Sequence, residues 1–337
     1  MIHDMGDNAV ADGNALDRVL VLEMVRVTEA AAVAASKLIG RGDEKAADHA
    51  AVEAMRAALN QLPFDGTVVI GEGERDEAPM LFIGEKVGTA QGTGPGIDIA
   101  LDPLEGTTIT AKAGPNALAV LAIAEQGCLL NAPDVYMDKL AIGPGYPDGT
   151  IDLARSASDN VRSLAAAKGV QPGDIIACVL DRPRHAELIA ELRALGCGIQ
   201  LIPDGDVAGV IAVTDPDTNI DIYMGSGGAP EGVLAAAALR CVGGQFQGRL
   251  LFRNDDERGR AARWGVEDLD RIYTLEDLAK GDVIFAATGV TDGSLLEGVK
   301  RRRGVVTTES VVMRAATGTV RWVKGEHRRA PGGIGTL

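Results

Sequence analysis

The apolar positions of the chain follow two different periods along its N-terminal part. They recur at helical spacing over 16–35 and again over 46–59, which predicts two helices separated by a glycine-containing break. Apolar and polar residues alternate over 96–102, and a period of two is typical of a strand. The run 117–127 is continuously apolar, which indicates a strand buried on both faces. A β-branched segment at 66–74 predicts a short strand that enters a glycine turn.

Beyond about residue 150, the pattern becomes a regular alternation of helices and strands. Helices are predicted over 158–170, 183–196 and 229–244, and a loop that enters a helix over 204–213. Strands are predicted over 174–181, 198–203, 282–290 and 304–314, and a strand that enters a glycine turn over 220–228. Residues 78–88 fit a short helix and a strand equally well. The alternation predicts an α/β protein in two lobes, an N-terminal lobe of residues 1–165 and a C-terminal lobe of residues 166–337.

Composition and charge narrow the class of protein. Hydrophobic residues make up 46% of the chain and charged residues 24%, as expected for a soluble globular protein. The net charge of −15 argues against a nucleic-acid-binding protein that relies on a general positive field, and it suits a protein that binds metal cations. The four cysteines have apolar neighbours and no C-x-x-C spacing, so we expect buried, reduced thiols rather than zinc ligands or disulfides.

The sequence has no visible signal for secretion or for membrane insertion. Residues 1–13 lack the basic and apolar segments of a signal peptide, and no apolar run approaches the ~18 residues that span a membrane. We therefore expect a cytoplasmic protein whose partner is a small molecule rather than a membrane or a nucleic acid. We also expect a homo-oligomer, either a dimer or a tetramer.

Three glycine-containing loops with acidic residues follow predicted strands, at 70–79, 101–108 and 225–232. Ligands of α/β proteins gather at the carboxyl ends of strands. The acids of these loops are Glu72, Glu74, Asp76, Glu77, Asp102, Glu105 and Glu231. Carboxylates as close as Asp102 and Glu105 repel each other, and a hard cation such as Mg²⁺ or Mn²⁺ would remove that repulsion. Two such ions can bind a phosphate ester and activate water.

Simpler interpretations exist for each loop taken alone. The acids of 70–79 would also suit a solvated turn, and Glu231 would also complement the positive end of its helix. The sequence GEGERD could suggest a dinucleotide-binding loop. However, Asp76 occupies the position of the third glycine of G-x-G-x-x-G, and an acidic loop repels pyrophosphate, so this function is rejected.

The motif DPLEGT resembles the D-P-[LI]-[DE]-G-[ST] signature of the lithium-sensitive, metal-dependent phosphatases, which include inositol monophosphatases and fructose-1,6-bisphosphatases. Together with GEGERDEAPM, IPDGDVAG and GGAPEG, it is similar to class II (GlpX-type) fructose-1,6-bisphosphatase of bacteria from about residue 17 to 325. The resemblance implies a layered two-lobe sugar-phosphatase fold with mixed sheets and helices, and an active site at strand ends in the cleft between the lobes. It also implies hydrolysis of the 1-phosphate of fructose 1,6-bisphosphate with Mn²⁺ or Mg²⁺, as used in gluconeogenesis or Calvin-type sugar metabolism.

The resemblance also implies roles for individual residues. The metal ligands it implies are Asp48, Glu72, Asp102, Glu105 and Glu231. The substrate-binding residues it implies are Glu105, Gly106, Thr107, Tyr136, Arg182, Pro183, Arg184, Asp204, Gly205, Asp206 and Gly228. At Arg182 some members carry lysine, which keeps the positive charge. We assign catalytic roles to Thr107, whose hydroxyl would orient or deprotonate the attacking water, and to Glu72, which with Glu74 and Asp98 is a candidate proton acceptor.

Two other functions stay open. Sedoheptulose-1,7-bisphosphatase activity, alone or beside the fructose reaction, would use the same residues. A protein that senses metal and sugar bisphosphate without turnover would have little need for the water-activating Thr107. Inositol monophosphatase activity is disfavoured because the longer segments do not follow its pattern.

Overall fold

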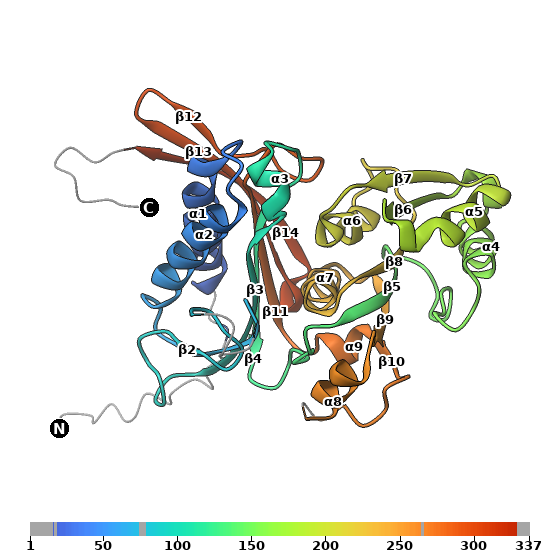
Figure 1. Ribbon diagram of the computed structural model, residues 1–337, viewed down its shortest axis with the longest axis horizontal. Coiled ribbons are helices and arrows are strands. Elements are labelled where there is room, and N and C mark those ends of the chain that lie inside the picture. The colour runs from blue at the N-terminus through green and yellow to red at the C-terminus, as the bar shows by residue number, and fades with distance from the viewer. Residues whose placement is uncertain (1–15, 17–18, 74–78, 264–265, 329–337) are drawn as a thin grey trace, which may run out of the picture.

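The computed structural model describes residue 16 and residues 19–73, 79–263 and 266–328. Within them, the protein is built from alternating layers of helices and sheets (Figure 1). Two helices cover the outer face of a larger sheet, further helices fill the space between that sheet and a smaller one, and another helix pair covers the smaller sheet on its far side. The prediction of a layered α/β fold with mixed sheets is confirmed.

The larger sheet has eight strands within the described residues. Its strands are β1 (Asp65–Ile70), β2 (Lys86–Val87), β3 (Gly96–Glu105), β4 (Leu118–Glu125), β11 (Val283–Gly289), β12 (Lys300–Arg302), β13 (Val305–Arg314) and β14 (Thr319–Arg328). Their order is β12-β13-β11-β4-β3-β1-β2, and β14 pairs with β13. Only β1 and β3 pair in parallel among these strands, so the sheet is mostly antiparallel.

The smaller sheet has six strands within the described residues, in the order β10-β9-β5-β8-β6-β7. These strands are β5 (Tyr136–Ile142), β6 (Ile176–Leu180), β7 (Gly198–Ile202), β8 (Ile222–Gly228), β9 (Gln245–Leu251) and β10 (Ile272–Thr274). Strand β6 runs parallel to β7 and β8, while β5 runs antiparallel to β8 and β9. Both sheets are therefore mixed.

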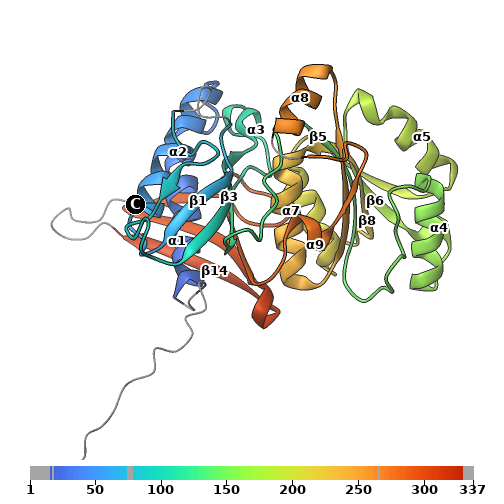
Figure 2. The same cartoon turned by 90° about the horizontal axis from the view of Figure 1, so that it is seen from below.

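The helices separate into three layers (Figures 1 and 2). In chain order they are α1 (Leu20–Ala35), α2 (Glu44–Leu59), α3 (Thr107–Ala111), α4 (Ala157–Lys168), α5 (Ala186–Ala194), α6 (Asp206–Ile211), α7 (Ala229–Val242), α8 (Asp255–Arg263) and α9 (Leu275–Leu278). Short 3-10 turns are η1 (Ser36–Leu38), η2 (Pro172–Asp174), η3 (Pro183–His185), η4 (Ala212–Thr214) and η5 (Ala315–Thr317). Helices α1 and α2 form one outer layer, α4 and α5 the other, and α7 lies between the sheets.

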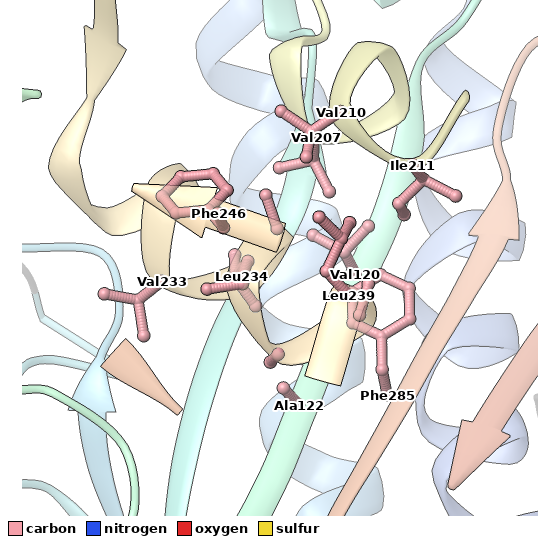
Figure 3. Packing of buried hydrophobic residues seen from close by; sticks show 14 of the residues in the cluster. Val120, Ala122, Val207, Val210, Ile211, Val233, Leu234, Leu239, Phe246 and Phe285 are labelled. Carbon is pink, nitrogen blue, oxygen red and sulfur yellow. The ribbon is translucent and has the colours of Figure 1, made fainter. Parts of the chain in front are cut away.

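Helix α7 forms the centre of the main hydrophobic core. It is rich in alanine and buried along nearly its whole length, because a helix that is apolar all round can pack between two sheets. Figure 3 shows Leu234 and Leu239 of α7 with Phe285 and Val120 of the larger sheet and Phe246 of the smaller one. The core therefore joins both sheets through one helix.

Local sequence signals explain where several elements begin and end. The Asp43 side chain accepts a hydrogen bond from the Ala46 N–H at the start of α2, and Ser156 does the same for α4 through Asp159. Helix α4 ends at Gly169 in the left-handed conformation. Strand β3 continues through Pro103, which is tolerated because the pairing with β4 is irregular between Asp102 and Glu105.

Some predicted elements differ from the structure. Residues 225–228 are not a loop but the end of β8, which passes directly into α7. The prediction also missed β5, because Lys139 lies at a buried position and interrupts its apolar pattern. It missed β9 and β14 as well, and the ambiguous residues 78–88 contain only the two-residue strand β2 as regular structure in their described part.

The two sheets divide the chain differently from the predicted lobes of 1–165 and 166–337. Strand β5 belongs to the smaller sheet, although it precedes residue 165. Strands β11–β14 return to the larger sheet, although they come from the C-terminal half. The return is favoured because β11 fits between β4 and β13, where all seven of its residues are buried.

The four cysteines are free thiols, and three of them, Cys178, Cys197 and Cys241, are buried. Burial raises the pKa of the Cys178 thiol to about 12 and that of Cys241 to about 12. These thiols therefore pack as small apolar groups. None of the helices in the described residues is both long and apolar enough to cross a membrane.

Candidate active site

A pocket of about 360 Å³ lies where the ends of β1 and β3 meet α2, α6 and α7. Its acidic lining residues are Asp48, Glu72, Asp102, Glu105, Asp134, Asp204, Asp206 and Glu231. Gly106 and Thr107 also line it. The carboxylates expected at three separate loops therefore face one space, together with Asp48 from α2.

The turn that follows β3 presents its acids through specific backbone geometry. Asp102 Oδ1 accepts a hydrogen bond from the Leu104 N–H at 3.0 Å, which folds the side chain back over Pro103. Gly106 has a φ of 94°, a left-handed conformation that costs glycine little, and α3 begins at the next residue, Thr107. The chain therefore turns sharply beneath the pocket and places Asp102, Glu105 and Thr107 along its wall.

Glu105 links the turn to α6. Its Oε1 accepts a hydrogen bond from the Val207 N–H at 3.0 Å. Its Oε2 is buried and has no hydrogen-bond partner in the described part of the protein. A buried carboxylate oxygen without a partner costs free energy, so this atom is suited to bind a cation or a donor from a ligand.

Mutual repulsion dominates the electrostatics of the pocket. Burial raises the pKa of Asp102 well above its ordinary value, and the charges of Glu72 and Glu231 raise it further. Burial also raises the pKa of Glu105 well above its ordinary value, with the charge of Asp206 as the next cause. Burial and then Asp48 raise the pKa of Glu72 to about 8. These groups would ionise more readily with a cation among them.

The donor set fits a hard divalent cation. The five predicted ligands offer only oxygen atoms, which is the preference of Mg²⁺ and Mn²⁺. Burial raises the pKa of Glu231, whereas Lys139 lowers it, and burial raises the pKa of Asp48. No group of three acidic, histidine or cysteine side chains is assembled closely enough to hold a metal among the described residues. The carboxylates thus line a common pocket without meeting at one point.

A basic region lies beside the acidic one. Arg184 of η3 donates hydrogen bonds to the Ser226 carbonyl and hydroxyl at 2.6–3.2 Å, and its guanidinium lies 4.9 Å from the centre of the Tyr136 ring. His185 Nε2 accepts from the Ser226 N–H at 2.8 Å, which places the ring proton on Nδ1, where it donates to the Leu180 carbonyl. Arg184 and Tyr136 are therefore held together at the end of β8.

The remaining predicted substrate residues have different surroundings. Arg182, at the start of the turn that contains Pro183, lies 3.5 Å from the Asp204 carboxylate. Gly205 adopts a left-handed conformation directly before α6, and its neighbours Asp204 and Asp206 line the pocket. A Cβ on Gly228 would overlap Glu231 Oε2, so glycine is required for the carboxylate to lie there.

The sequence did not point to three charged residues at this site. Asp134 lines the pocket, Lys139 forms a buried ion pair with Asp206, and the guanidinium of Arg253 lies 5.2 Å from the centre of the Tyr136 ring. A buried lysine in a sheet strand is a signal that could have revealed Lys139. Asp134 and Arg253 lie in charged segments without a distinctive sequence pattern, so only the three-dimensional structure shows that they belong to this region.

Asp98 has a different environment from the pocket acids. Its Oδ2 accepts hydrogen bonds from the N–H groups of Gly127, Cys128 and Leu129 at 2.7–3.2 Å. It thereby organises the turn after β4 and is not among the pocket-lining residues. Glu74, Asp76 and Glu77, which the sequence analysis also considered, lie outside the described residues.

Comparison with known proteins agrees with this fold and pocket. The sequence profile of bacterial fructose-1,6-bisphosphatase, glpX-encoded, matches residues 18–327. Together with the layered α/β fold and the acidic pocket, the match defines a sugar-phosphate phosphatase, a hydrolase that works with a divalent metal. More narrowly, the chain belongs to the glpX-encoded family of bacterial fructose-1,6-bisphosphatases.

Individual relatives support the same assignment. The chain is 49% identical over 324 residues to fructose-1,6-bisphosphatase 1 class 2 of Escherichia coli K12, covering 92% of this chain and 95% of the relative. The same identity and coverage apply to fructose-1,6-bisphosphatase class 2 of Shigella flexneri.

Two solved structures show a more remote likeness. Extragenic suppressor protein suhB from Bartonella henselae has 16% identity and a TM-score of 0.34, over 58% of this chain and 75% of that protein. Inositol monophosphatase from Anabaena has 15% identity and a TM-score of 0.30, over 58% of this chain and 71% of that protein. Because both scores are low, neither likeness bears on the function of this chain.

Proposed function

We propose that this protein hydrolyses the 1-phosphate of fructose 1,6-bisphosphate to give fructose 6-phosphate and phosphate. Membership in the fructose-1,6-bisphosphatase family across residues 18–327 is the observation that carries the proposal. The site supports it in chemical terms. An acidic pocket suited to cations lies beside arginines suited to a second phosphate, as a sugar with two phosphates requires.

The proposed metal ions are Mn²⁺ or Mg²⁺, held by Asp48, Glu72, Asp102, Glu105 and Glu231. When bound, such ions neutralise phosphate charge and lower the pKa of water. Support comes from the oxygen-only donor set and from the unpartnered Oε2 of Glu105. The carboxylates would bind the ions, and Glu72 would also take up the proton of the attacking water. The adjacent turn of Gly106 and Thr107 would contact the phosphate oxygens.

Thr107 is proposed to orient the attacking water or to help deprotonate it. Its position supports this role, because it lines the pocket at the first residue of α3, two positions after Glu105. Thr107→Ser should retain much of the activity, and Thr107→Ala should lower kcat by about 10²-fold, as expected for loss of general acid–base assistance. Full kcat for Thr107→Ala at saturating metal and substrate would rule out the role.

The remote phosphate is proposed to bind Arg184, with Tyr136 beneath it and with Arg182 and Pro183 in the same turn. Asp204, Gly205, Asp206 and Gly228 would contact the sugar. Binding energy from the remote phosphate positions the reacting one. Arg184→Ala should therefore impair hydrolysis of the bisphosphate more than hydrolysis of fructose 1-phosphate. Equal impairment of both substrates would contradict this assignment.

The decisive experiment is phosphate release by the purified protein with Mn²⁺ or Mg²⁺. Fructose 1,6-bisphosphate, sedoheptulose 1,7-bisphosphate and inositol 1-phosphate would be compared, with EDTA as the control. We expect metal-dependent release from the bisphosphates and none from the inositol ester. The ratio of the two bisphosphate rates decides whether the protein is a fructose enzyme or has both activities. No release from any substrate, with metal confirmed bound, would favour a sensor of metal and sugar bisphosphate.

We further propose a cytoplasmic homo-oligomer, a dimer or a tetramer. The acidic composition and the absence of an apolar spanning helix among the described residues are compatible with this location. Light scattering of the purified protein would measure the oligomeric state directly.

A further inference from the structure

A fully buried lysine contacts one of the pocket acids. Lys139 of β5 has no exposed side-chain surface, and it forms an ion pair with Asp206, which lines the pocket. Burial of both charges costs free energy, and apolar side chains of similar size often stabilise a protein at least as well as a buried ion pair does. Stability alone therefore does not explain why a lysine occupies this position.

Two glycines provide the space for this pair. A Cβ on Gly227 of β8 would lie 2.0 Å from Asp206 Oδ2 and 3.2 Å from Lys139 Nζ. A Cβ on Gly232 of α7 would lie 3.2 Å from Lys139 Cε. A side chain at Gly227 would push the carboxylate away. Strand β8 and helix α7 therefore both restrict where Lys139 and Asp206 can meet.

Helix α6 is held at its first two residues. It packs against α7 (Figure 1), and it has only six residues, so its own hydrogen bonds do little to fix its direction. The Asp206 carboxylate is bonded to Lys139, and the N–H of the next residue, Val207, donates to Glu105 Oε1 at 3.0 Å. Contacts with β5 and with the turn after β3 therefore set the start of α6.

The start of α6 joins the two parts of the proposed active site. Asp206 is a proposed contact for the sugar, and Glu105 is a proposed metal ligand whose Oε2 has no hydrogen-bond partner in the described part of the chain. The negative charge of Asp206 also repels Glu105 and Glu231. Without a cation beside it, Asp206 would be driven away from these carboxylates, and the Val207 N–H would move with it. The charge of Lys139 opposes that movement.

We infer that Lys139 is a positioning residue for both parts of the active site. By holding Asp206, it fixes the start of α6, and the Val207 N–H then orients Glu105. Lys139 is not among the residues that line the pocket, so it acts through these neighbours rather than by touching the substrate. This role rests on the proposed function, and it predicts that loss of Lys139 weakens the binding of sugar and of metal together.

The test measures the two affinities separately by calorimetry. Fructose 6-phosphate, the proposed product, is titrated in EDTA, and Mn²⁺ is titrated without sugar. We expect Lys139→Met to weaken the binding of each by about tenfold, since loss of a group that orients a metal ligand costs about 10–100-fold in affinity. KM for fructose 1,6-bisphosphate should rise by a similar factor. Circular dichroism at the working temperature checks that the variant is folded.

Gly227→Ala tests the same contact without removing a charge. Gly227 does not have a positive φ, so alanine suits its backbone, but the added Cβ would displace the Asp206 carboxylate from Lys139. We expect the Kd values for both ligands to rise by about threefold or more. This variant decides the question if Lys139→Met does not fold.

Arg314→Met is the matched control for lost stability. Arg314 is a nearly buried cation that lies 2.8 Å from the Asp282 carboxylate, and neither residue lines the pocket. The substitution should lower stability, as Lys139→Met does, because it also leaves a carboxylate without its cation. It should leave both Kd values unchanged.

Unchanged Kd values in either folded variant, Lys139→Met or Gly227→Ala, would overturn the inference. A loss confined to one ligand would also overturn it, as would an equal loss in Arg314→Met. If the unaltered protein binds both ligands but hydrolyses no bisphosphate, the hydrolytic function fails and the comparison of Kd values still tests Lys139. If it binds neither ligand, the proposed function and the inference both fail.

Discussion

Lys139 forms an ion pair with Asp206, which lines the acidic pocket, and the Lys139 side chain is fully buried. Lys139 comes from the middle of β5, and Asp206 is the first residue of α6. Asp206 therefore has a buried cation as its partner, and the charge of the same lysine also lowers the pKa of Glu231. Removing Lys139 would leave Asp206 buried beside the charges of Glu105 and Glu231.

Lys139→Met should therefore destabilise the protein by about 3–5 kcal/mol, the usual cost of breaking a buried pair by removing one partner. Urea unfolding monitored by circular dichroism would measure this loss. The midpoint urea concentration should fall, while the dependence of the unfolding free energy on urea concentration stays the same. Lys324→Met is the control, because Lys324 is an exposed lysine 3.2 Å from Glu309. It should leave the midpoint nearly unchanged. Equal midpoints for Lys139→Met and the unaltered protein would show that Asp206 does not depend on this partner.

Gly228→Ala should raise the metal concentration that the enzyme needs. A Cβ at this position would overlap Glu231 Oε2, so the carboxylate must move away. We expect about a tenfold higher Mn²⁺ concentration at half-maximal phosphate release, equivalent to ~1.4 kcal/mol. Because a carboxylate end can rotate, the thermal midpoint should change little.

Gly173→Ala is the control for this substitution. Gly173 does not have a positive φ, and the nearest atom to its added Cβ would be 3.6 Å away. Its metal requirement should match that of the unaltered protein. If Gly228→Ala also needs no additional metal, Glu231 is not a ligand in the position proposed.

The metal-free protein should lose stability as pH rises. Glu72 has an ordinary pKa of 4.5, and burial with the charge of Asp48 raises it to about 8 in the folded protein. Because the folded state binds this proton more tightly, the stabilising contribution is complete below pH 4.5 and is lost as pH rises through about 8.

Thermal unfolding in EDTA between about pH 4 and about pH 9 would measure this loss, because that range contains both pKa values. Glu72→Gln cannot ionise, so its stability relative to the unaltered protein should increase with pH. Saturating Mn²⁺ should remove most of the difference in pH dependence, because a cation stabilises the ionised carboxylate. A pH-independent difference between the two proteins would exclude Glu72 as the titrating group.

His185 should contribute the opposite pH dependence. Its pKa is lowered from 6.5, mainly because burial disfavours the imidazolium. The stabilising contribution is therefore complete above pH 6.5 and is lost as pH falls through the lowered pKa of the folded protein. Protonation would also remove the acceptor for the Ser226 N–H.

His185→Gln should consequently be less stable than the unaltered protein at pH 8 by about 1–3 kcal/mol, the cost of an unsatisfied buried group, and the gap should narrow in acid. Urea unfolding of both proteins at several pH values would measure this difference in stability. His49→Gln, at a histidine whose side chain is 59% exposed, is the control and should show no such trend. A gap that widens in acid would contradict the neutral form of His185.

Several local elements were predictable from the sequence because their signals are local. The alternation of 96–102 and the apolar run of 117–127 predicted strands that became β3 and β4. The helix pattern of 229–244 became α7. Motif resemblance located Asp48, Glu72, Asp102, Glu105 and Glu231, which the structure brings to one pocket. Their roles as metal ligands remain predictions.

Other features depended on contacts between distant segments. Strand β5 was not predicted because a buried lysine such as Lys139 is stable only with a charged partner. That partner, Asp206, lies on another element. Arg253 had no signal in its own segment, since Tyr136 is brought to it by the pairing of β5 with β9. The return of β11–β14 to the larger sheet was hidden for the same reason, because strand pairing does not follow chain order.

The amino-acid pattern alone was enough to predict the helices and strands with strong periodicity, the acidic strand ends and the family of the protein. These follow from neighbours within a few residues, where periodicity, capping and turn chemistry act. The three-dimensional packing was needed to show which carboxylates face one another, which of them has a buried lysine as its partner, and which two arginines lie against Tyr136. Those relationships come from the packing of two sheets around α7, and the energies of buried charges depend on that packing rather than on position along the chain.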